Sequence, residues 1–210
     1  MDLSTWLAFV AASTALLLIP GPTVLLVLAY AVSKGRRIAV PTALGVATGD
    51  LIAMTASLAG LGAVVLTSAT LFTVLKWIGA VYLVWLGVRM ILGARHTSLD
   101  LPQASGDLTP RMAFSNAAAV TALNPKSIIF FIAFVPLFIV PGPAFLPQAT
   151  ILIVTFVALA GVNALAYALL ADRLRAAIRR PTIIQWLTRA GGGTLIAMGV
   201  ATAALRRNPA

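Results

Sequence analysis

The amino-acid sequence predicts an all-α integral membrane protein with six transmembrane helices, arranged as two inverted three-helix repeats whose first helix is broken. Three observations lead to this prediction. The 210 residues are 60% hydrophobic and only 10% charged, whereas soluble domains are roughly 45–50% apolar and about 25% charged. The apolar residues are concentrated in long runs, and the basic residues gather in alternate connections between these runs. We therefore interpret the chain, 1–210, as a single transmembrane domain.

Each of six apolar runs is long enough to form a membrane-spanning helix, since about 20 apolar residues cross the roughly 30 Å hydrocarbon core. The runs cover residues 3–32, 39–66, 71–92, 113–140, 146–170 and 182–205. They lack the alternating pattern of membrane β-barrel strands, and helices are the other structure that satisfies the backbone in lipid. The first run is not expected to be a cleaved signal peptide, because Asp2 stands where such a peptide has basic residues.

The charges in the connections predict the orientation of the chain, because cytoplasmic loops of membrane proteins are enriched in Lys and Arg. The first, third and fifth connections are basic, whereas the second and fourth contain no charged residue. The basic residues of these connections are Lys34, Arg36, Arg37, Arg95, Arg111, Arg173, Arg175, Arg179 and Arg180. We therefore expect the basic connections to be cytoplasmic and both termini to lie on the outer face of the membrane.

A faint internal repeat relates the two halves of the chain. The first three-helix repeat is expected at 1–92 and the second at 113–210, joined by a cytoplasmic linker at 93–112. Asp50 of the first half aligns with Asn163 of the second, and each half contains a proline-interrupted first run. Three helices per half give the halves opposite orientations, which fits the exchange of basic and uncharged loops between them. Inverted repeats are typical of transporters, whose substrate site lies at mid-membrane where interrupted helices meet.

Two interruptions of the apolar runs are candidate parts of a binding site. Pro20, Gly21 and Pro22 lie inside the first run, and Asn124 and Pro125 lie inside the fourth. A proline removes a backbone donor and clashes with the preceding turn, so carbonyl oxygens are left without helical partners. Such a break is tolerated in lipid only where protein or a wet cavity covers it. A packing kink is the alternative interpretation, and the occurrence of a break in both halves favours a site.

Three polar side chains within the apolar runs are further candidates. Asp50 is the one acid inside a run, and a carboxylate at the bilayer centre costs about 2.5–3.5 kcal/mol on insertion scales, so it should face the protein interior. Lys126 follows Asn124 and Pro125, where a new helix would direct its N–H groups and this ammonium at an anion. Asn163 offers an uncharged donor and acceptor at a similar depth. The alternatives are a structural ion pair between Asp50 and Lys126, and an Asn163 that only joins helices.

The composition also limits the chemistry and the partners of the chain. Cysteine is absent and the single histidine, His96, lies in the polar linker, so we expect no enzyme activity, no catalytic residues, no metal site and no cofactor. Most of the basic residues behind the net charge of +10 lie between the apolar runs, as in a membrane protein. We therefore expect no nucleic-acid partner. The expected partners are a small-molecule substrate, protons, membrane lipid and a second copy in a homodimer. A structural subunit of a larger complex remains an alternative.

Four ordered motifs give the chain a resemblance to a known family. They are Pro20-Gly21-Pro22, Gly45-x3-Gly49-Asp50, Lys76-Trp77-Ile78-Gly79-Ala80-x-Tyr82-Leu83-x3-Gly87, and Asn124-Pro125-Lys126 followed by Phe130-Phe131 and Pro136. In these motifs, and over nearly its whole length, the chain resembles the LysE/RhtB family of amino-acid exporters. The resemblance implies export of amino acids or related metabolites across the bacterial inner membrane, driven by the proton gradient.

Two features favour a neutral cargo over a basic amino acid. Val135-Pro136-Leu137-Phe138 stands where the family pattern has Pro-Gln-Phe, and no second carboxylate lies within a run. The resulting hypothesis is proton-coupled antiport by alternating access. In this hypothesis Asp50 carries the coupling proton, and the cargo is bound by Pro20, Gly21, Pro22, Asp50, Asn124, Pro125, Lys126 and Asn163. A cation or metal-ion transporter that uses Asp50 as an oxygen ligand is the alternative.

Overall fold

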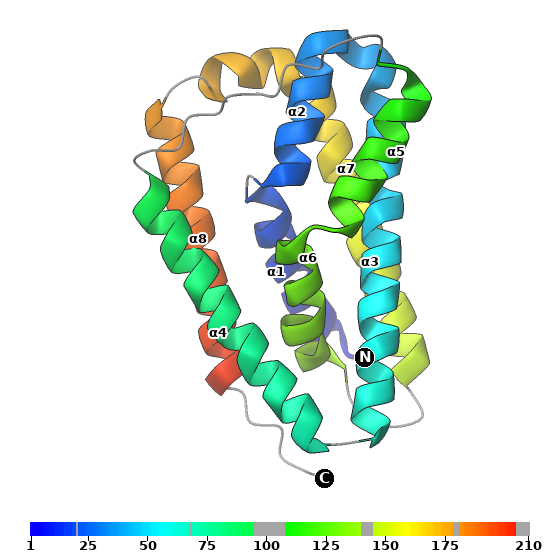
Figure 1. Ribbon diagram of the computed structural model, residues 1–210, viewed down its shortest axis with the longest axis vertical. Helices are drawn as coiled ribbons and strands as arrows, with labels where there is room; N and C mark the ends of the chain where they lie inside the picture. Colours follow the sequence, from blue (N-terminus) through cyan, green and yellow to red (C-terminus); the bar gives the residue numbers. More distant parts are fainter. Residues whose placement is uncertain (20, 68, 95–107, 140–144, 179–180, 205–210) are drawn as a thin grey trace.

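The computed structural model describes residues 1–19, 21–67, 69–94, 108–139, 145–178 and 181–204, and its ordered elements in these ranges are all helical (Figure 1). The elements are α1 (Leu3–Leu18), α2 (Pro22–Lys34), η1 (Gly35–Ile38), α3 (Ala39–Thr67), α4 (Ala69–Gly93), α5 (Pro110–Ala122), α6 (Pro125–Ile129), η3 (Phe130–Phe134), η4 (Val135–Phe138), α7 (Phe145–Ile178) and α8 (Pro181–Ala204). The predicted all-α membrane fold class is confirmed.

The described helices provide three to five candidate membrane spans. Three single helices contain a span, at Ala39–Gly62, Thr73–Gly93 and Phe145–Ala171. Two bent pairs pass the same criteria of length and composition: Leu3–Leu18 with Pro22–Val32, bent by 58°, and Pro110–Ala122 with Pro125–Phe138, bent by 44°. The helix α8 coincides with the sixth predicted run, and the six-span repeat as a whole stays a prediction.

Both predicted breaks are present, and local sequence explains them. After α1 the backbone of Ile19 is extended, and Gly21 is an extended N-cap for α2, which begins at Pro22. In the second half Asn124 caps α6, which begins at Pro125. Proline suits the first position of a helix because its missing N–H would have had no helical partner there. Each break is therefore the start of a new helix.

The second broken helix changes its winding after the break. Directly after α6, the segment η3 is a π-helix and η4 is a 3₁₀-helix. Pro136 lies within η4 and lacks the N–H that a regular helix needs. Short π-helical turns are frequent at functional sites, and this one lies just beyond the break of the second half.

Exposed basic residues gather at one end of the molecule, where several helices begin or end. The end of α2, the start of α3, the end of α4 and the start of α5 lie in the upper part of Figure 1, whereas α3 ends and α4 begins at the bottom. Lys34, Arg37 and Arg111 are exposed on elements of the upper end. We therefore call this the basic end. Its location in the cytoplasm stays a prediction.

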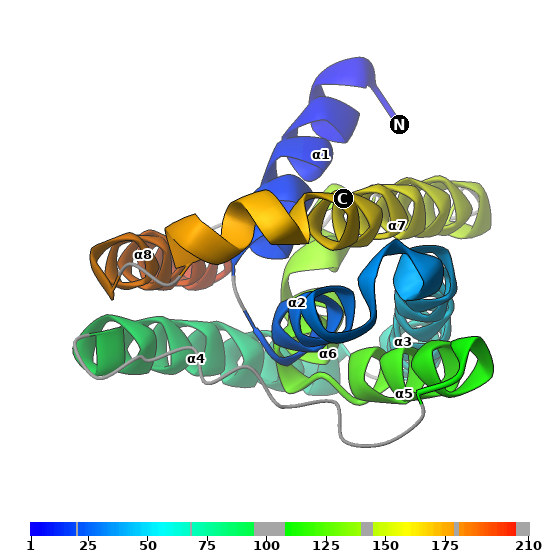
Figure 2. The same ribbon diagram turned by 90° about the horizontal axis from the view of Figure 1, so that it is seen from above.

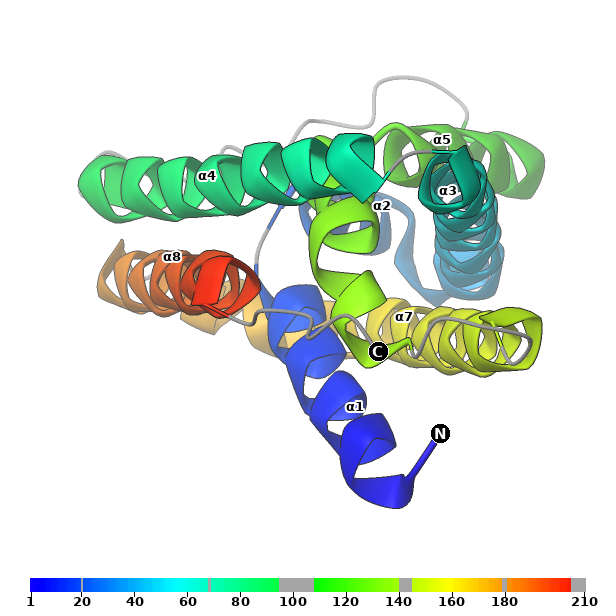
Figure 3. The same cartoon turned by 90° about the horizontal axis from the view of Figure 1, so that it is seen from below.

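The two halves pack against each other in a reciprocal way. Figures 2 and 3 show α4 beside α8 on one side of the molecule, α3 with α5 and α7 on the other, and α2 and α6 between them. The broken helix α1–α2 packs on α7, and the broken helix that starts with α5 packs on α3. Thus the second helix of each half holds the broken first helix of the other half, as expected for an inverted repeat.

Glycines allow the closest of these helix contacts. On α3, a Cβ atom at Gly45 would lie 2.3 Å from the carbonyl oxygen of Phe114, and one at Gly49 would lie 2.5 Å from that of Ala118. Between α4 and α8, Gly87 and Gly192 approach each other's carbonyl oxygens in the same way, at 2.5 and 2.6 Å from the added Cβ. Small residues are enriched at such interfaces in membranes because they let backbones approach closely.

We predict that Gly49→Ala lowers the free energy of unfolding by about 1–3 kcal/mol, because the new methyl group overpacks the contact between α3 and α5. Gly60→Ala is the matched control, since it lies on the same helix and nothing lies within 4 Å of its added Cβ. Thermal unfolding of the two purified variants in detergent measures the difference. Equal midpoints for both variants would contradict the close contact.

Candidate functional site

The break after α1 leaves four backbone carbonyl oxygens facing side chains of the second half. Carbonyls at the end of a helix lack the partners of a regular helical turn. Here those of Leu16, Leu17, Leu18 and Ile19 accept from such side chains, and the Leu16 oxygen also accepts the backbone N–H of Ile19 at 3.2 Å. Lys126 Nζ on α6 donates to two of them, at 3.2 Å to Leu16 and 3.1 Å to Ile19. Asn163 Nδ2 on α7 donates to the Leu17 oxygen at 3.2 Å. The Tyr167 hydroxyl donates to the Leu18 oxygen at 3.4 Å.

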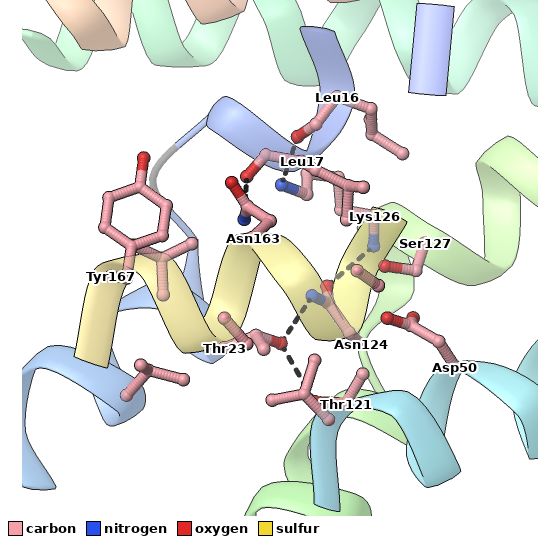
Figure 4. Close-up of a pocket in the computed structure, with 15 residues that line it drawn as sticks. Leu16, Leu17, Thr23, Asp50, Thr121, Asn124, Lys126, Ser127, Asn163 and Tyr167 are labelled. Atoms are coloured by element: carbon pink, nitrogen blue, oxygen red, sulfur yellow. Dashed lines mark hydrogen bonds between the residues drawn. The ribbon is translucent and has the colours of Figure 1, made fainter. Parts of the chain in front are cut away.

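These donors line a cavity at the meeting point of the two breaks (Figure 4). Its polar lining residues are Thr23, Asp50, Thr121, Asn124, Lys126, Ser127, Asn163 and Tyr167, and the rest of the lining is apolar. The cavity has a volume of about 30 Å³, which is room for about two water molecules. An amino acid is larger than this cavity.

Asp50 brings a buried carboxyl group to this cavity. Asp50 lies on α3 and is only 2% exposed. Its Oδ1 has no hydrogen-bond partner in the part of the chain that the structure describes. The neighbouring Gly49 lets α5 approach to contact distance, which places Asp50 close to the second break. An ionised carboxylate in such surroundings is unfavourable unless it is paired. The free oxygen is therefore available to a proton or to a cationic group.

Lys126 contacts backbone rather than the carboxylate. Both hydrogen bonds of its ammonium group go to the carbonyl oxygens of α1, and neither goes to Asp50. The two side chains line the same cavity without a hydrogen bond between them. The structural ion pair between these residues, the alternative interpretation, therefore has no direct hydrogen bond to support it.

Hydrogen bonds from α2 to α5 and to the cap of α6 lie on the side of the cavity toward the basic end. The hydroxyl oxygens of Thr23 and Thr121 are 3.3 Å apart, and Asn124 Nδ2 donates to the Thr23 hydroxyl at 3.3 Å. Nearer the basic end, Asn116 Nδ2 donates to the Tyr30 hydroxyl at 2.9 Å. We call these three bonds the polar contact. It joins the broken helices of the two halves through side chains alone.

An aromatic cluster lies on the other side of the cavity, along the chain that follows α6. Its members are Phe9, Phe130, Phe131, Phe134, Phe138 and Phe156. Neighbouring rings in the cluster have centroids between 4.8 and 6.0 Å apart, which is the range of favourable aromatic pairs. The cavity therefore lies between a polar contact and a thick apolar barrier.

Four of the eight predicted site residues line the cavity: Asp50, Asn124, Lys126 and Asn163. They come from α3, the cap of α6, α6 itself and α7, so the fold brings both halves to one point. The side chain of Asn124 also accepts a hydrogen bond from the backbone N–H of Lys126 at 3.1 Å. This N–H is one of those that we expected, from the sequence, to point at an anion. Their roles in binding stay predictions.

The other predicted residues shape the breaks instead of lining the cavity. Pro22 and Pro125 are exposed first residues of α2 and α6. Gly21 lies against Lys126, because a Cβ added to it would be 3.4 Å from Nζ. Pro20 lies outside the described residues.

Sequence reasoning missed several lining residues. Tyr167 follows Asn163 by one helical turn and therefore shares its face of α7, a signal that could have identified it. Thr23 and Ser127 directly follow the residues of the two breaks, which is a weaker signal. Thr121 carries no signal in the sequence, because hydroxyl side chains are common in apolar helices. Within the described residues, no three His, Cys, Asp or Glu side chains cluster as metal ligands would.

Comparison with known proteins identifies the relatives of the chain. A homoserine/homoserine lactone efflux protein of Salmonella typhimurium is 34% identical over 206 residues, covering 98% of this chain and 99% of that protein. A leucine efflux protein of Klebsiella pneumoniae is 32% identical over 146 residues, covering 67% of this chain and 68% of that protein. An uncharacterized membrane protein of Vibrio cholerae is 33% identical over 205 residues, covering 95% of this chain and 97% of that protein.

No solved structure matches the chain. The LysE type translocator family matches residues 14–205, which include both breaks and every residue that lines the cavity. The resemblance seen in the sequence motifs is thereby confirmed, and the chain belongs to the LysE type translocator family of multi-pass membrane transporters.

Proposed function

We propose that the protein exports neutral amino acids, or metabolites related to them, across the bacterial inner membrane in exchange for protons. The observation that carries this proposal is the cavity between the two helix breaks, where carbonyl oxygens, a carboxyl group and an ammonium group converge. An α-amino acid carries one ammonium and one carboxylate, and the cavity contains partners for both. The efflux proteins among the relatives support the same class of cargo.

The cargo's ammonium group has two partners in this proposal: the carbonyl oxygens at the end of α1 and the free oxygen of Asp50. Its carboxylate is bound by Lys126, with Ser127 beside it in the cavity lining. The two cargoes in the name of the Salmonella relative share an α-amino group, but the lactone has no free carboxylate. Recognition of the amino group is therefore the chemistry common to them, and the α1 carbonyls are the part of the cavity suited to it.

Proton coupling is assigned to Asp50. A single group that binds either a proton or the cargo's ammonium makes the two compete, and this competition produces antiport. Asp50 is the one acidic residue of the cavity lining, and its free Oδ1 can accept either partner. The proton is bound when the cavity faces the outer side and is released when it faces the cytoplasm.

Alternating access requires the cavity to open on each side in turn. Separation of α2 from α5 would break the polar contact and open the basic end. Separation of α1 from η4 would part Phe9 from Phe138 of the aromatic cluster and open the opposite end. The reciprocal packing of the two halves supports this motion, because each broken helix rests on the other half. Both openings lead to the same cavity.

We predict that Asp50→Asn abolishes the acceleration of leucine or homoserine transport by a pH gradient in proteoliposomes, because the amide cannot carry a proton. Exchange of labelled for unlabelled substrate without a gradient should persist. Asp2→Asn is the matched control, since Asp2 lies at the N-cap of α1 and outside the cavity. Full gradient-driven transport by Asp50→Asn would refute the coupling role.

A second prediction concerns the cargo. Neutral amino acids should compete with labelled leucine or homoserine for transport more strongly than lysine does, because the cavity offers one carboxyl group and Lys126 repels a second cation. Competition measured with proteoliposomes at a fixed pH gradient tests this. The alternative, a metal-ion transporter, predicts instead that a labelled divalent cation is transported and that amino acids do not compete.

A further inference from the structure

We propose that Lys126 is an internal substitute for the ammonium group of the cargo. Its Nζ occupies the carbonyl oxygens at the end of α1, and an entering cargo displaces it. This inference rests on the proposed function, because it takes the same carbonyls as the binding site for the cargo's amino group. It adds that the site is already filled by the protein and that loading is an exchange of one ammonium for another.

The geometry of the contact is that of a bound primary ammonium. Lys126 reaches from α6 and donates two hydrogen bonds, of 3.2 and 3.1 Å, to the oxygens of Leu16 and Ile19. An ammonium group has three donors, and the protonated α-amino group of a cargo has the same charge and the same donors. Two carbonyl oxygens cannot distinguish these groups by chemistry. A cargo that reaches this point therefore competes directly with Lys126.

The charges in the cavity give the displaced lysine new partners. Its two present acceptors are neutral carbonyls, whereas Asp50 across the cavity keeps one oxygen free. When the cargo's ammonium takes the carbonyls, Lys126 can bind the cargo's carboxylate or Asp50. The exchange adds a zwitterion of zero net charge, so the number of unpaired charges in the cavity does not rise. A cargo with both groups completes the exchange better than an amine alone.

The volume of the cavity at the break is consistent with Lys126 as a stand-in for the cargo's ammonium group. The cavity holds about 30 Å³ in its present state, and the lysine side chain fills the place that a cargo needs. Gly21 borders this place, since a Cβ added to it would be in van der Waals contact with Nζ, at 3.4 Å. Withdrawal of the lysine also removes a link between α6 and the end of α1. Asn163 and Tyr167 then remain as the side chains of α7 that hold this end.

The test compares binding of n-propylammonium, an amine without a carboxylate, to purified wild-type protein and to Lys126→Met. Methionine has a similar length but no charge, so it leaves the carbonyls unoccupied. When a competitor fills a site most of the time, the apparent affinity of a ligand equals its intrinsic affinity multiplied by the fraction of free sites. We expect the variant to bind propylammonium about tenfold or more tightly than the wild type does, as measured by calorimetry. The uncharged n-propanol should bind neither protein.

Lys34→Met is the matched control, because Lys34 is exposed at the end of α2 and outside the cavity; it should bind propylammonium as the wild type does. If Lys126 only binds the cargo's carboxylate, Lys126→Met will lose affinity for leucine and gain none for propylammonium. That result overturns the inference and leaves the proposed function standing. Failure of the wild type to bind any amino acid would refute the proposed function, while the propylammonium comparison would still decide the inference.

A second measurement covers the case in which Lys126→Met does not fold. The chain has three lysines, Lys34, Lys76 and Lys126, so selective ¹³Cε labelling of lysine gives a simple NMR spectrum of the wild-type protein. Assignment with Lys34→Met and Lys76→Met identifies the Lys126 signal by elimination. Saturating propylammonium or leucine should shift this signal as the lysine leaves the carbonyls. An unchanged Lys126 signal in protein that demonstrably binds leucine would overturn the inference.

Discussion

The requirement that a broken helix satisfy its backbone inside the membrane determines the design of this protein. Water is absent from the hydrocarbon core, so a free carbonyl oxygen there costs several kcal/mol. Four oxygens at the end of α1 accept hydrogen bonds from three side chains of the second half, and one of them, that of Leu16, also accepts the backbone N–H of Ile19. The same requirement explains why Lys126, Asn163 and Tyr167 converge at this point. A structural necessity and a candidate binding site are thus one set of hydrogen bonds.

Close helix packing places the acid beside those donors. The contact between α3 and α5 depends on Gly45 and Gly49, whose missing side chains let the backbones touch. Asp50 is the next residue, so its position relative to the α6 cap follows directly from this contact. This contact joins the two halves of the chain, and so does the packing of α1 and α2 against α7. The cavity therefore exists only when both halves are assembled.

Local features of the sequence were sufficient to predict the helices, their breaks and the polar residues at their centres. Apolar runs determine where helices cross, prolines determine where they stop, and a charge such as Asp50 stands out against an apolar background. The partner of Lys126 could not be predicted in this way, because it is backbone, and backbone carbonyls are identical at every residue. Thr121 was missed for a related reason: its importance comes from the opposite Thr23 hydroxyl, a contact that only the tertiary fold creates.

The two barriers around the cavity differ in chemistry. The polar contact consists of hydroxyl and amide groups, which can exchange their mutual hydrogen bonds for bonds to water at little net cost, and the buried apolar cluster beside it is small: Tyr30, Ile38 and Ala113. The aromatic cluster has no such compensation, since parting it exposes apolar ring surface at roughly 25 cal/mol per Å². With no cargo bound, the cavity is therefore expected to open more readily at the basic end. The charge pattern predicts that this end is cytoplasmic, which is the side from which an exporter loads its cargo.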